Sequence, residues 1–429
     1  MKKVIIPVIL ILLGATSCLK MDFYPHNALS RYNIGEEEMP IFYNGLYNLS
    51  QYKPTSDGYY TNDILGGDLE RTGGSAGFSP AMQVQALVIP TGGFINGPWT
   101  GYYAWLYQVN CFLESAEQMS DDNMNKQLYL GTGHFFRGLI YYNLTSHWRS
   151  IPILRHPTND PVPSSPEADC WALVEEEFQA AIDQLGVYAG DNTYVSKQAA
   201  QALMARTLLA EGKMTEAAQM AEAVITSGYF SLDTYENIWD KDKSSEVIFA
   251  YANNGADENG LIMSSLFRGS PSYVPTSGFE QVVLTNDERY GWLHYADGQY
   301  VTLNKYNTYG GYDPLMVTRL SEMYLISAEA KGRTDGLARL NELRAKRGLP
   351  ALEAFSSDEA FVDAILAERR LELVGEGFRW FDLVRTGRYE KTLGLDSKYT
   401  VLPIPEEQIN RSKGVLKQNP VWESTNIGE

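Results

Sequence analysis

Three glutamates at four-residue spacing are the residues of this 429-residue chain that most resemble catalytic machinery. Glu368, Glu372 and Glu376 fall on one face of a predicted helix. Paired carboxylates are the groups with which a glycosidase cleaves its substrate. Acids that stand beside arginines on a helix more often form ion pairs with neighbouring helices, here with Arg379 or Arg385 as the expected partners. We therefore interpret the three glutamates as scaffold.

A second pattern resembles catalytic machinery only on paper. Residues 73–77 read Gly-Gly-Ser-Ala-Gly and match the G-x-S-x-G nucleophile elbow, which needs a strand before it and a helix after it. A polar stretch precedes this segment and Pro80 follows it, so we interpret it as a turn. The five histidines show no H-E-x-x-H pairing. The sequence therefore predicts neither an enzyme nor a cofactor or metal site.

The amino terminus has the layout of a secretory signal peptide, with Lys2 and Lys3 followed by the apolar run Val4–Leu13. This run has about half of the roughly 20 apolar residues that a transmembrane helix needs, so a permanent span is the weaker interpretation. The small residues directly before Cys18 resemble the lipobox of bacterial lipoproteins. The resemblance implies that residues 1–17 are removed and Cys18 is acylated. An ordinary signal peptide with a chance cysteine is the alternative.

Composition limits the partners and the fold. The net charge of −18 argues against nucleic acid, whose phosphates require basic patches. With 44% hydrophobic residues the chain can bury a sizeable core, and its length fits one large domain or two to three ordinary ones. Cys111 and Cys170 could form a disulfide in an exported protein. They could equally remain two buried thiols.

Helical periodicity appears in blocks along the chain. The clearest block, residues 196–225, predicts two helices joined at Gly212, with small alanines at four-residue spacing as in a tetratricopeptide (TPR) pair. The other expected helices are a pair within 102–146, one after Ser165-Pro166, one over 315–331, one over 337–346, and one opened by a Ser356–Glu359 capping box. We expect a mainly α fold, a TPR-like scaffold of about four helix pairs. An irregular α-solenoid of another type is the alternative.

Two Gly-rich stretches, 51–100 and 251–314, lack this periodicity and are too long for simple connections. We expect them to be loop-rich inserts that form a binding face, because long ordered loops commonly carry function. The expected helical core covers about 30–50, 101–250 and 315–388. A closing segment, 389–429, completes a single domain that begins at residue 18.

Aromatic side chains supply the positive signal for binding. Tyrosine occurs 28 times, more than Phe and Trp together, and its ring combines an apolar face with a polar edge. Such rings can stack on sugars while acids and arginines bond the hydroxyl groups. The candidate ligand-binding residues are Asp68, Arg71 and Trp99 from the first insert, and Tyr273, Trp292, Tyr300, Tyr306 and Tyr309 from the second. Trp99 could instead pack inside the scaffold.

The carboxyl-terminal half carries four ordered motifs that resemble those of the SusD/RagB-like family. They are Arg319–Ala330 (R-x-x-E-x-Y-L-x-x-A-E-A), Leu340–Leu349 (L-N-x-V-R-x-R-A-G-L), Glu368–Arg385 (E-R-R-x-E-L-x-x-E-G-x-R-x-x-D-L-x-R), and the closing segments Leu402–Pro405 and Gln418–Pro420. Lys346-Arg347 stands where the family usually shows Arg-Ala, a departure expected to have little effect. The amino-terminal half agrees more loosely, for example at Asn44–Tyr47 and Arg137–Tyr141.

The resemblance implies a lipid-anchored protein on the outer membrane of a Bacteroidetes-type bacterium, without catalytic activity. It would capture a nutrient, an oligosaccharide or alternatively a peptide, for a SusC-like TonB-dependent transporter. Calcium binding and the identity of the ligand are left open. A surface glycosidase and a TPR-type protein-interaction scaffold are the competing interpretations.

Overall fold

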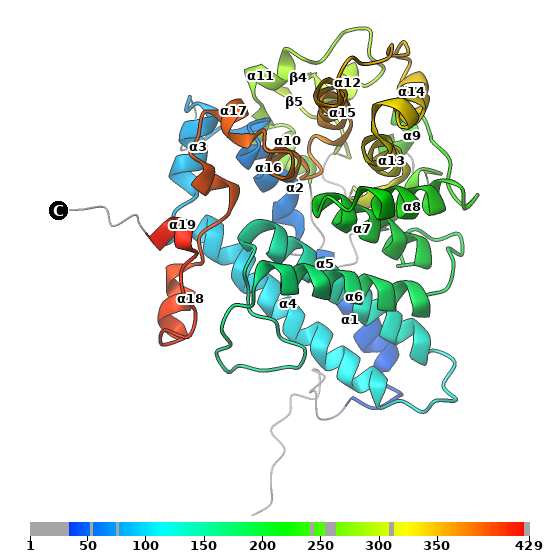
Figure 1. Cartoon of the computed structure of the whole chain (residues 1–429), viewed down its shortest axis with the longest axis vertical. Helices are drawn as coiled ribbons and strands as arrows, with labels where there is room; N and C mark the ends of the chain where they lie inside the picture. The colour runs from blue at the N-terminus through cyan, green and yellow to red at the C-terminus, as the bar shows by residue number, and fades with distance from the viewer. Residues whose placement is uncertain are drawn as a thin grey trace, which may run out of the picture.

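The computed structural model describes residues 34–51, 55–73, 77–240, 244–253, 263–308 and 313–423. Cys18 with the predicted signal peptide, Ser75 of the G-x-S-x-G segment, and Tyr309 lie outside the described residues. Within them the chain is mainly helical, as predicted (Figure 1).

A stack of helices forms the scaffold, and each helix packs against the next one along the chain. The scaffold helices are α1 (Met39–Gln51), α4 (Gly93–Glu117), α5 (Lys126–Trp148), α6 (Glu167–Gln184), α7 (Lys197–Ala210), α8 (Met214–Ile225), α13 (Leu320–Asp335), α14 (Leu337–Lys346), α15 (Asp358–Leu373) and α16 (Arg379–Arg385). Contacts run from α4 through α5, α6 and α7 to α8, and then across the second insert to α13, α14 and α15. Neighbour-to-neighbour packing of this kind is typical of TPR-like solenoids.

Glycines permit the closest approaches in this stack. A Cβ at Gly133 of α5 would overlap Leu113 of α4, and a Cβ at Gly138 would lie 2.9 Å from the Phe178 ring of α6. Because no other residue lacks a Cβ, these two positions set how closely α4 and α6 can pack on α5.

The helix predicted over 315–331 is wrong at its start. Leu315–Arg319 is strand β6, which pairs antiparallel with β2 (Val247–Tyr251), and every residue of both strands is buried. The helix α13 begins only at Leu320, and its regular backbone breaks at Gly332, close to the predicted end. A short apolar run cannot be assigned to helix or strand from periodicity alone.

Two helix starts differ from prediction by one residue. The Ser357 hydroxyl, and not that of Ser356, accepts from Ala360 N and opens α15. Pro166 precedes α6 in the capping position, without a side-chain cap from Ser165. Such one-residue shifts are within the usual uncertainty of helix boundaries.

Short elements, and not irregular loops alone, fill the two predicted inserts. The first insert holds α2 (Thr55–Leu65), β1 (Leu69–Arg71), α3 (Pro80–Leu87) and the start of α4. The second insert follows α9 (Tyr235–Asp240) and β2. It holds α10 (Ser264–Phe267), β3 (Tyr273–Pro275), α11 (Ser277–Glu280), α12 (Tyr290–Leu293), β4 (Tyr295–Asp297) and β5 (Tyr300–Thr302). In Figure 1 the labels of α11, α12, β4 and β5 gather toward the top, away from α4 and α6.

Tryptophan N–H groups hold the closing segment, which contains α17 (Tyr389–Leu393), a 3₁₀ turn (Ser397–Thr400), α18 (Glu406–Arg411) and α19 (Pro420–Glu423). Trp148 Nε1 donates to Pro403 O at 2.9 Å, and Trp422 Nε1 donates to Val401 O at 2.9 Å. Cys111 and Cys170 are both buried and are not joined in a disulfide, so the disulfide alternative does not apply.

Candidate functional site

The two inserts meet through a short β-ladder. Strand β1 of the first insert pairs antiparallel with β3 of the second, and Arg71 lies directly opposite Tyr273. The Thr72 hydroxyl extends the contact by donating to Pro271 O at 2.6 Å. Two predicted binding residues, about 200 positions apart in the sequence, are therefore cross-strand neighbours.

An aromatic pair lies beside this ladder. The Tyr60 ring of α2 stacks on the Tyr273 ring with centroids 4.2 Å apart and planes 18° apart. The Tyr60 hydroxyl donates to Asp57 Oδ1 at 2.5 Å. Burial, with the nearby Asp57 carboxylate, raises the pKa of Tyr60, which keeps its hydroxyl protonated.

We call Asp57, Tyr60, Arg71 and Tyr273 the insert face. Arg71 is exposed, and the other three side chains are half-buried. The face thus combines a carboxylate that is bonded to Tyr60, an exposed guanidinium and two half-buried aromatic rings. Tyr60 and Asp57 were missed at the sequence level because they belong to a helix that lacks clear periodicity.

A second arginine–aromatic contact flanks the ladder. The Arg268 guanidinium lies 4.2 Å from the centroid of the Tyr295 ring in β4, and Arg268 Nε lies 3.3 Å from Asp297 Oδ2. The hairpin β4–β5 carries Tyr295 and Asp297, Arg268 directly follows α10, and β5 contacts β3 of the ladder. Trp292 and Tyr300, both predicted binding residues, are half-buried on the same insert.

The Asp68 carboxylate pairs with two arginines of the scaffold and is almost fully buried. Its carboxylate lies 2.6 Å from Arg370 Nη2 of α15 and 3.4 Å from Arg379 Nε, and the residue is 1% exposed. Asp68 therefore ties the first insert to the scaffold, which corrects its prediction as a ligand contact.

Tyr306 and Trp99 are enclosed as well. Tyr306 is fully buried, and its hydroxyl donates to Gly375 O at 2.7 Å. Trp99 is 3% exposed and packs edge-on against Trp148, with ring centroids 5.2 Å apart. Both were predicted to bind ligand. Tyr306 has no exposed surface and packs in the core, whereas Trp99 packs on Trp148 and also borders the groove over α4.

A groove of about 570 Å³ lies over the exposed side of α4, and Trp99 contributes to its lining. Tyr103 and Tyr107, one and two turns further along α4, line the same groove, together with the extended segment 152–162 and residues 408–416. Its size falls within the roughly 300–1,000 Å³ of ordinary ligand sites. Its concave shape and aromatic residues make it a further candidate ligand surface, and it shares no residue with the insert face.

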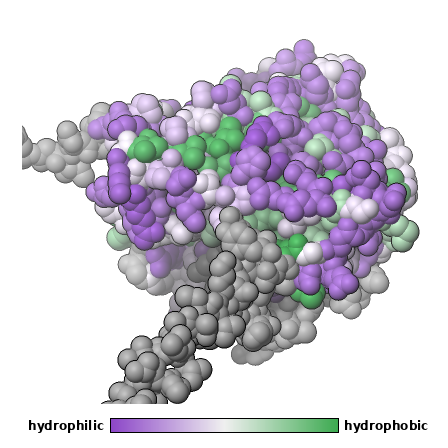
Figure 2. Space-filling view, turned by 90° about the horizontal axis from the view of Figure 1, so that it is seen from below, coloured by the Kyte–Doolittle hydropathy of each residue, from purple (hydrophilic) through white to green (hydrophobic). Residues whose placement is uncertain are grey.

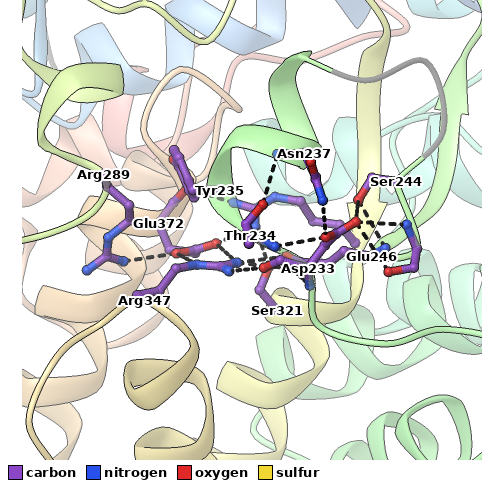
Figure 3. Close-up of polar contacts among 12 residues, drawn as sticks. Asp233, Thr234, Tyr235, Asn237, Ser244, Glu246, Arg289, Ser321, Arg347 and Glu372 are labelled. Atoms are coloured by element: carbon purple, nitrogen blue, oxygen red, sulfur yellow. Dashed lines mark hydrogen bonds and ion pairs between the residues drawn. The ribbon is translucent and has the colours of Figure 1, made fainter.

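The three spaced glutamates lie in a buried lattice of charges that we call the core ionic cluster. It comprises Glu246, Arg289, Lys305, Arg319, Arg347, Glu368, Glu372 and Glu376, and Glu368 joins it at 2.7 Å from Arg289 Nη1. Glu372 occupies its centre, at 2.8 Å from Arg347 Nη2 and 2.9 Å from Arg289 Nη1 (Figure 3). Arg319 bonds the same carboxylate and also Glu376, at 2.9 Å. The ion-pair interpretation of the glutamates is confirmed.

Burial and neighbouring charges shift the pKa values in this cluster in opposite directions. Burial alone would raise the pKa of Glu372, but Arg347 and Arg319 hold it well below its usual value. Burial lowers the pKa of Lys305 to about 8, and Glu376 opposes that shift. Glu372 and Glu376, whose pKa values are both lowered by neighbouring cations, are therefore held as paired anions.

The prediction that Arg379 or Arg385 pairs with these glutamates is wrong. Arg379 lies beside Asp68, and Arg385 bonds Glu329 and Asp382. Arg347, a departure from the motif expected to have little effect, is fully buried and contacts Glu246 at 3.0 Å as well as Glu372. Arg289 and Lys305 belong to the second insert, so the cluster also fastens that insert to the scaffold.

The outer surface is mostly hydrophilic on the side seen in Figure 2, with hydrophobic residues in short runs. None of the helices in the described ranges has the length and apolar character needed to cross a bilayer. Among the described side chains, no group of three or more His, Cys, Asp or Glu is placed to hold a metal ion.

Two family models match the chain. The SusD family model matches residues 246–400, and a model described as "Starch-binding associating with outer membrane" matches residues 35–209. Among curated relatives, SusD-like protein P38 of Formosa agariphila is 24% identical over 372 residues, covering 69% of this chain and 73% of the relative. SusD-like protein P2 of the same organism is 21% identical and covers 83% and 86%.

Solved structures share the fold. A laminarin-binding SusD-like protein aligns with a TM-score of 0.76 at 22% identity, covering 90% of this chain and 99% of that one. Surface glycan-binding protein A from Bacteroides fluxus aligns with a TM-score of 0.77 at 19% identity, with the same coverage. A SusD superfamily protein from Bacteroides thetaiotaomicron aligns with a TM-score of 0.76 at 24% identity, covering 90% and 100%.

Proposed function

Because the chain belongs to the SusD/RagB-like family, we propose that it is a non-catalytic outer-membrane lipoprotein that captures an oligosaccharide. It delivers this ligand to a SusC-like TonB-dependent transporter. The family description names starch binding and the outer membrane, and two of the similar structures bear glycan-binding names. Acylation of Cys18 supplies the anchor.

The observation that carries the proposal is the geometry of the insert face. Tyr60 and Tyr273 form a stacked pair of half-buried rings, so these side chains should lose little further entropy on binding. Arg71 beside it offers several N–H donors, and Asp57 is an acceptor. This combination suits a sugar, which presents an apolar C–H face and a rim of hydroxyl groups.

The buried ion pairs of the scaffold support the proposal that the protein has no catalytic activity. Glu368, Glu372 and Glu376 are almost fully buried and each is paired with a cation. A glycosidase needs two carboxyl groups that face the scissile bond across several ångströms of open space. We expect no product from any bound glycan, and hydrolysis by purified protein that disappears in Glu372→Gln would contradict this.

Binding measured by calorimetry against a panel of oligosaccharides and peptides tests the ligand class and the site together. Tyr273→Ala and Arg71→Ala should each weaken glycan affinity roughly tenfold, about 1–2 kcal/mol, because each removes one contact. Tyr229→Ala is the matched control, since Tyr229 is a 43%-exposed tyrosine outside the inserts.

Other outcomes identify other sites. Loss of binding in Tyr107→Ala, with Tyr273→Ala unaffected, would place the ligand in the groove over α4. Binding of peptides but not glycans would favour the peptide alternative. No binding to either class, with intact fold, would contradict the proposal and favour a protein-interaction scaffold.

The anchor and the transporter are tested in cells. Cys18→Ala should release the protein from the outer-membrane fraction, because a single acylated residue then no longer holds it. Tagged protein purified from native outer membranes in mild detergent should bring a TonB-dependent transporter with it. The shared membrane raises the effective concentration of the two proteins, so a modest interface can persist. Recovery of the protein alone, with uptake unaffected by its deletion, would contradict the transporter partner.

A further inference from the structure

A second cavity lies inside the helical scaffold, away from the insert face. Its volume is about 220 Å³, and side chains from α5, α6, α7, α13, α15 and α16 line it. This volume can hold several water molecules. That is below the roughly 300 Å³ at which drug-sized sites begin, so any organic occupant is small.

Three polar groups of this lining have no partner within the described chain. Thr145 Oγ1, Ser146 Oγ and Arg369 Nη1 are buried and make no hydrogen bond there. Thr145 is fully buried and Arg369 is 3% exposed. A buried donor without a partner costs about 1–3 kcal/mol, so three in one cavity indicate a polar occupant.

The arginines that line the cavity differ in whether a carboxylate already bonds them. Arg206 is bonded to Glu322, Arg385 to Glu329 and Asp382, and Arg369 through Nε to Asp382 at 2.7 Å. Arg149 has no carboxylate within ion-pair distance among the described residues; its Nη2 donates to Thr400 Oγ1 at 3.3 Å. Its charge is therefore available to an anion.

The backbone at Arg149 is strained. This residue ends α5 with φ 62° and ψ −76°, a γ-turn conformation that side chains with a Cβ rarely adopt. Such strain costs on the order of 1–3 kcal/mol and is found preferentially at functional sites. Here it places a long cationic side chain at the cavity where glycine would fit the backbone better.

Rings complete the cavity. Trp171 and Phe381 line it on either side of Tyr142, with ring centroids 6.0 Å and 6.2 Å from the Tyr142 ring. Glu167 also lines it and accepts from Trp171 Nε1 at 3.4 Å, which leaves lone pairs that can accept hydroxyl groups. Aromatic walls beside an arginine that no carboxylate bonds fit a ligand with an apolar C–H face and one carboxylate.

We propose that this cavity binds a small organic carboxylate of up to monosaccharide size, a hexuronate being the model ligand. The carboxylate meets Arg149 and Arg369 Nη1, the hydroxyls of Thr145 and Ser146 bond the ligand, and the ring lies against Trp171. The site is independent of the insert face. Carboxylate recognition by guanidinium groups follows the ordinary preference of arginine for planar anions.

The test compares D-glucuronate with D-glucose by calorimetry on the mature protein, since the two differ only by a carboxylate for a CH₂OH group. Glucuronate should bind at least tenfold more tightly. Arg149→Gly should abolish that preference while the melting temperature stays equal or rises, because glycine relieves the positive φ. Ser146→Ala should weaken glucuronate a few-fold, and Tyr273→Ala should leave it unchanged.

Equal affinity for both sugars, or binding of neither, would overturn the proposal and leave a cavity filled by water. A glucuronate preference that survives in Arg149→Gly but disappears in Tyr273→Ala would also overturn it, because the carboxylate would then bind at the insert face. Loss of oligosaccharide binding in Tyr273→Ala tests the proposed function alone, so the two proposals can fail separately.

Discussion

The core ionic cluster and the insert face both contain arginines and carboxylates, and these groups have opposite properties in the two regions. In the cluster Arg289, Arg319 and Arg347 are almost fully buried, and carboxylates bond each of them. On the insert face Arg71 is exposed beside a stacked tyrosine pair. The difference shows that environment, and not residue type, decides whether an arginine supports the fold or is free for a ligand.

Tyrosines follow the same division. Tyr306 is buried with its hydroxyl bonded to Gly375 O, whereas Tyr60 presents part of its ring beside Tyr273. Mutations matched in type but placed in the two regions should therefore separate stability from binding. Four predictions use this contrast.

The largest effect is expected at the centre of the cluster. Glu372→Gln leaves three buried arginines without their shared anion, and breaking a buried ion pair typically costs about 3–5 kcal/mol. Urea denaturation measures the loss. The exposed Glu353 offers the control, because Glu353→Gln should stay within about 0.5 kcal/mol of the parent. A loss below about 1 kcal/mol for Glu372→Gln would contradict the role of the cluster.

The second prediction compares a buried tyrosine with a half-buried one. Tyr306→Ala should cost about 3–5 kcal/mol of unfolding free energy, because it opens a cavity in the core. Tyr60→Ala should cost about 1 kcal/mol, the value of a half-exposed aromatic pair, and should weaken glycan affinity. Equal losses of stability in the two variants would show that the insert face is part of the core.

The scaffold also has a pH-sensitive position. Burial lowers the pKa of His147 to about 4, and the ring stacks on Trp380 at 5.2 Å. Above about pH 6.5 the imidazole is neutral in both folded and unfolded chains. As pH falls from 6.5 to 4 the unfolded chain binds a proton and the folded chain does not, so stability is lost, by up to about 3 kcal/mol.

His147→Gln isolates this contribution. The stability difference between the parent and the variant, measured by urea denaturation, should shrink as pH falls from 7 to 4. A difference independent of pH would mean that His147 titrates normally in the folded protein.

The smallest effect is expected for a surface ion pair. Arg155 and Glu176 form two 2.7 Å contacts but are 43% and 57% exposed. Glu176→Gln should cost less than about 1 kcal/mol, and the loss should fall further at high salt. A loss of unfolding free energy close to that of Glu372→Gln would contradict the explanation that burial makes the ion pairs of the core ionic cluster important for stability.

Family motifs predicted the scaffold because they encode charges that pair with one another. Arg319, Arg347, Glu372 and Glu376 come from three motifs spread over about 60 residues, and they meet in one cluster. The partners could not be predicted, since the sequence gives spacing along a helix but not the neighbouring helix. Arg379 and Arg385 were near in sequence and turned out to bond other acids.

Strands were the main elements that the sequence hid. Leu315–Arg319 continues directly into α13, so its apolar run read as the first turns of a helix until its pairing with β2 was known. Strand β1 has three residues, too few for an alternating pattern to be recognised. Both strands are defined by partners far away in the chain.

The sequence by itself determined the mainly helical class, most helix positions and the family, because these depend on local periodicity and on ordered motifs. Tertiary structure decided which candidates are exposed. Asp68, Trp99 and Tyr306 are enclosed, Arg71 and Tyr273 become neighbours, and Tyr60 joins them from α2. Exposure depends on what packs against a side chain, and those packing partners lie tens to hundreds of residues away.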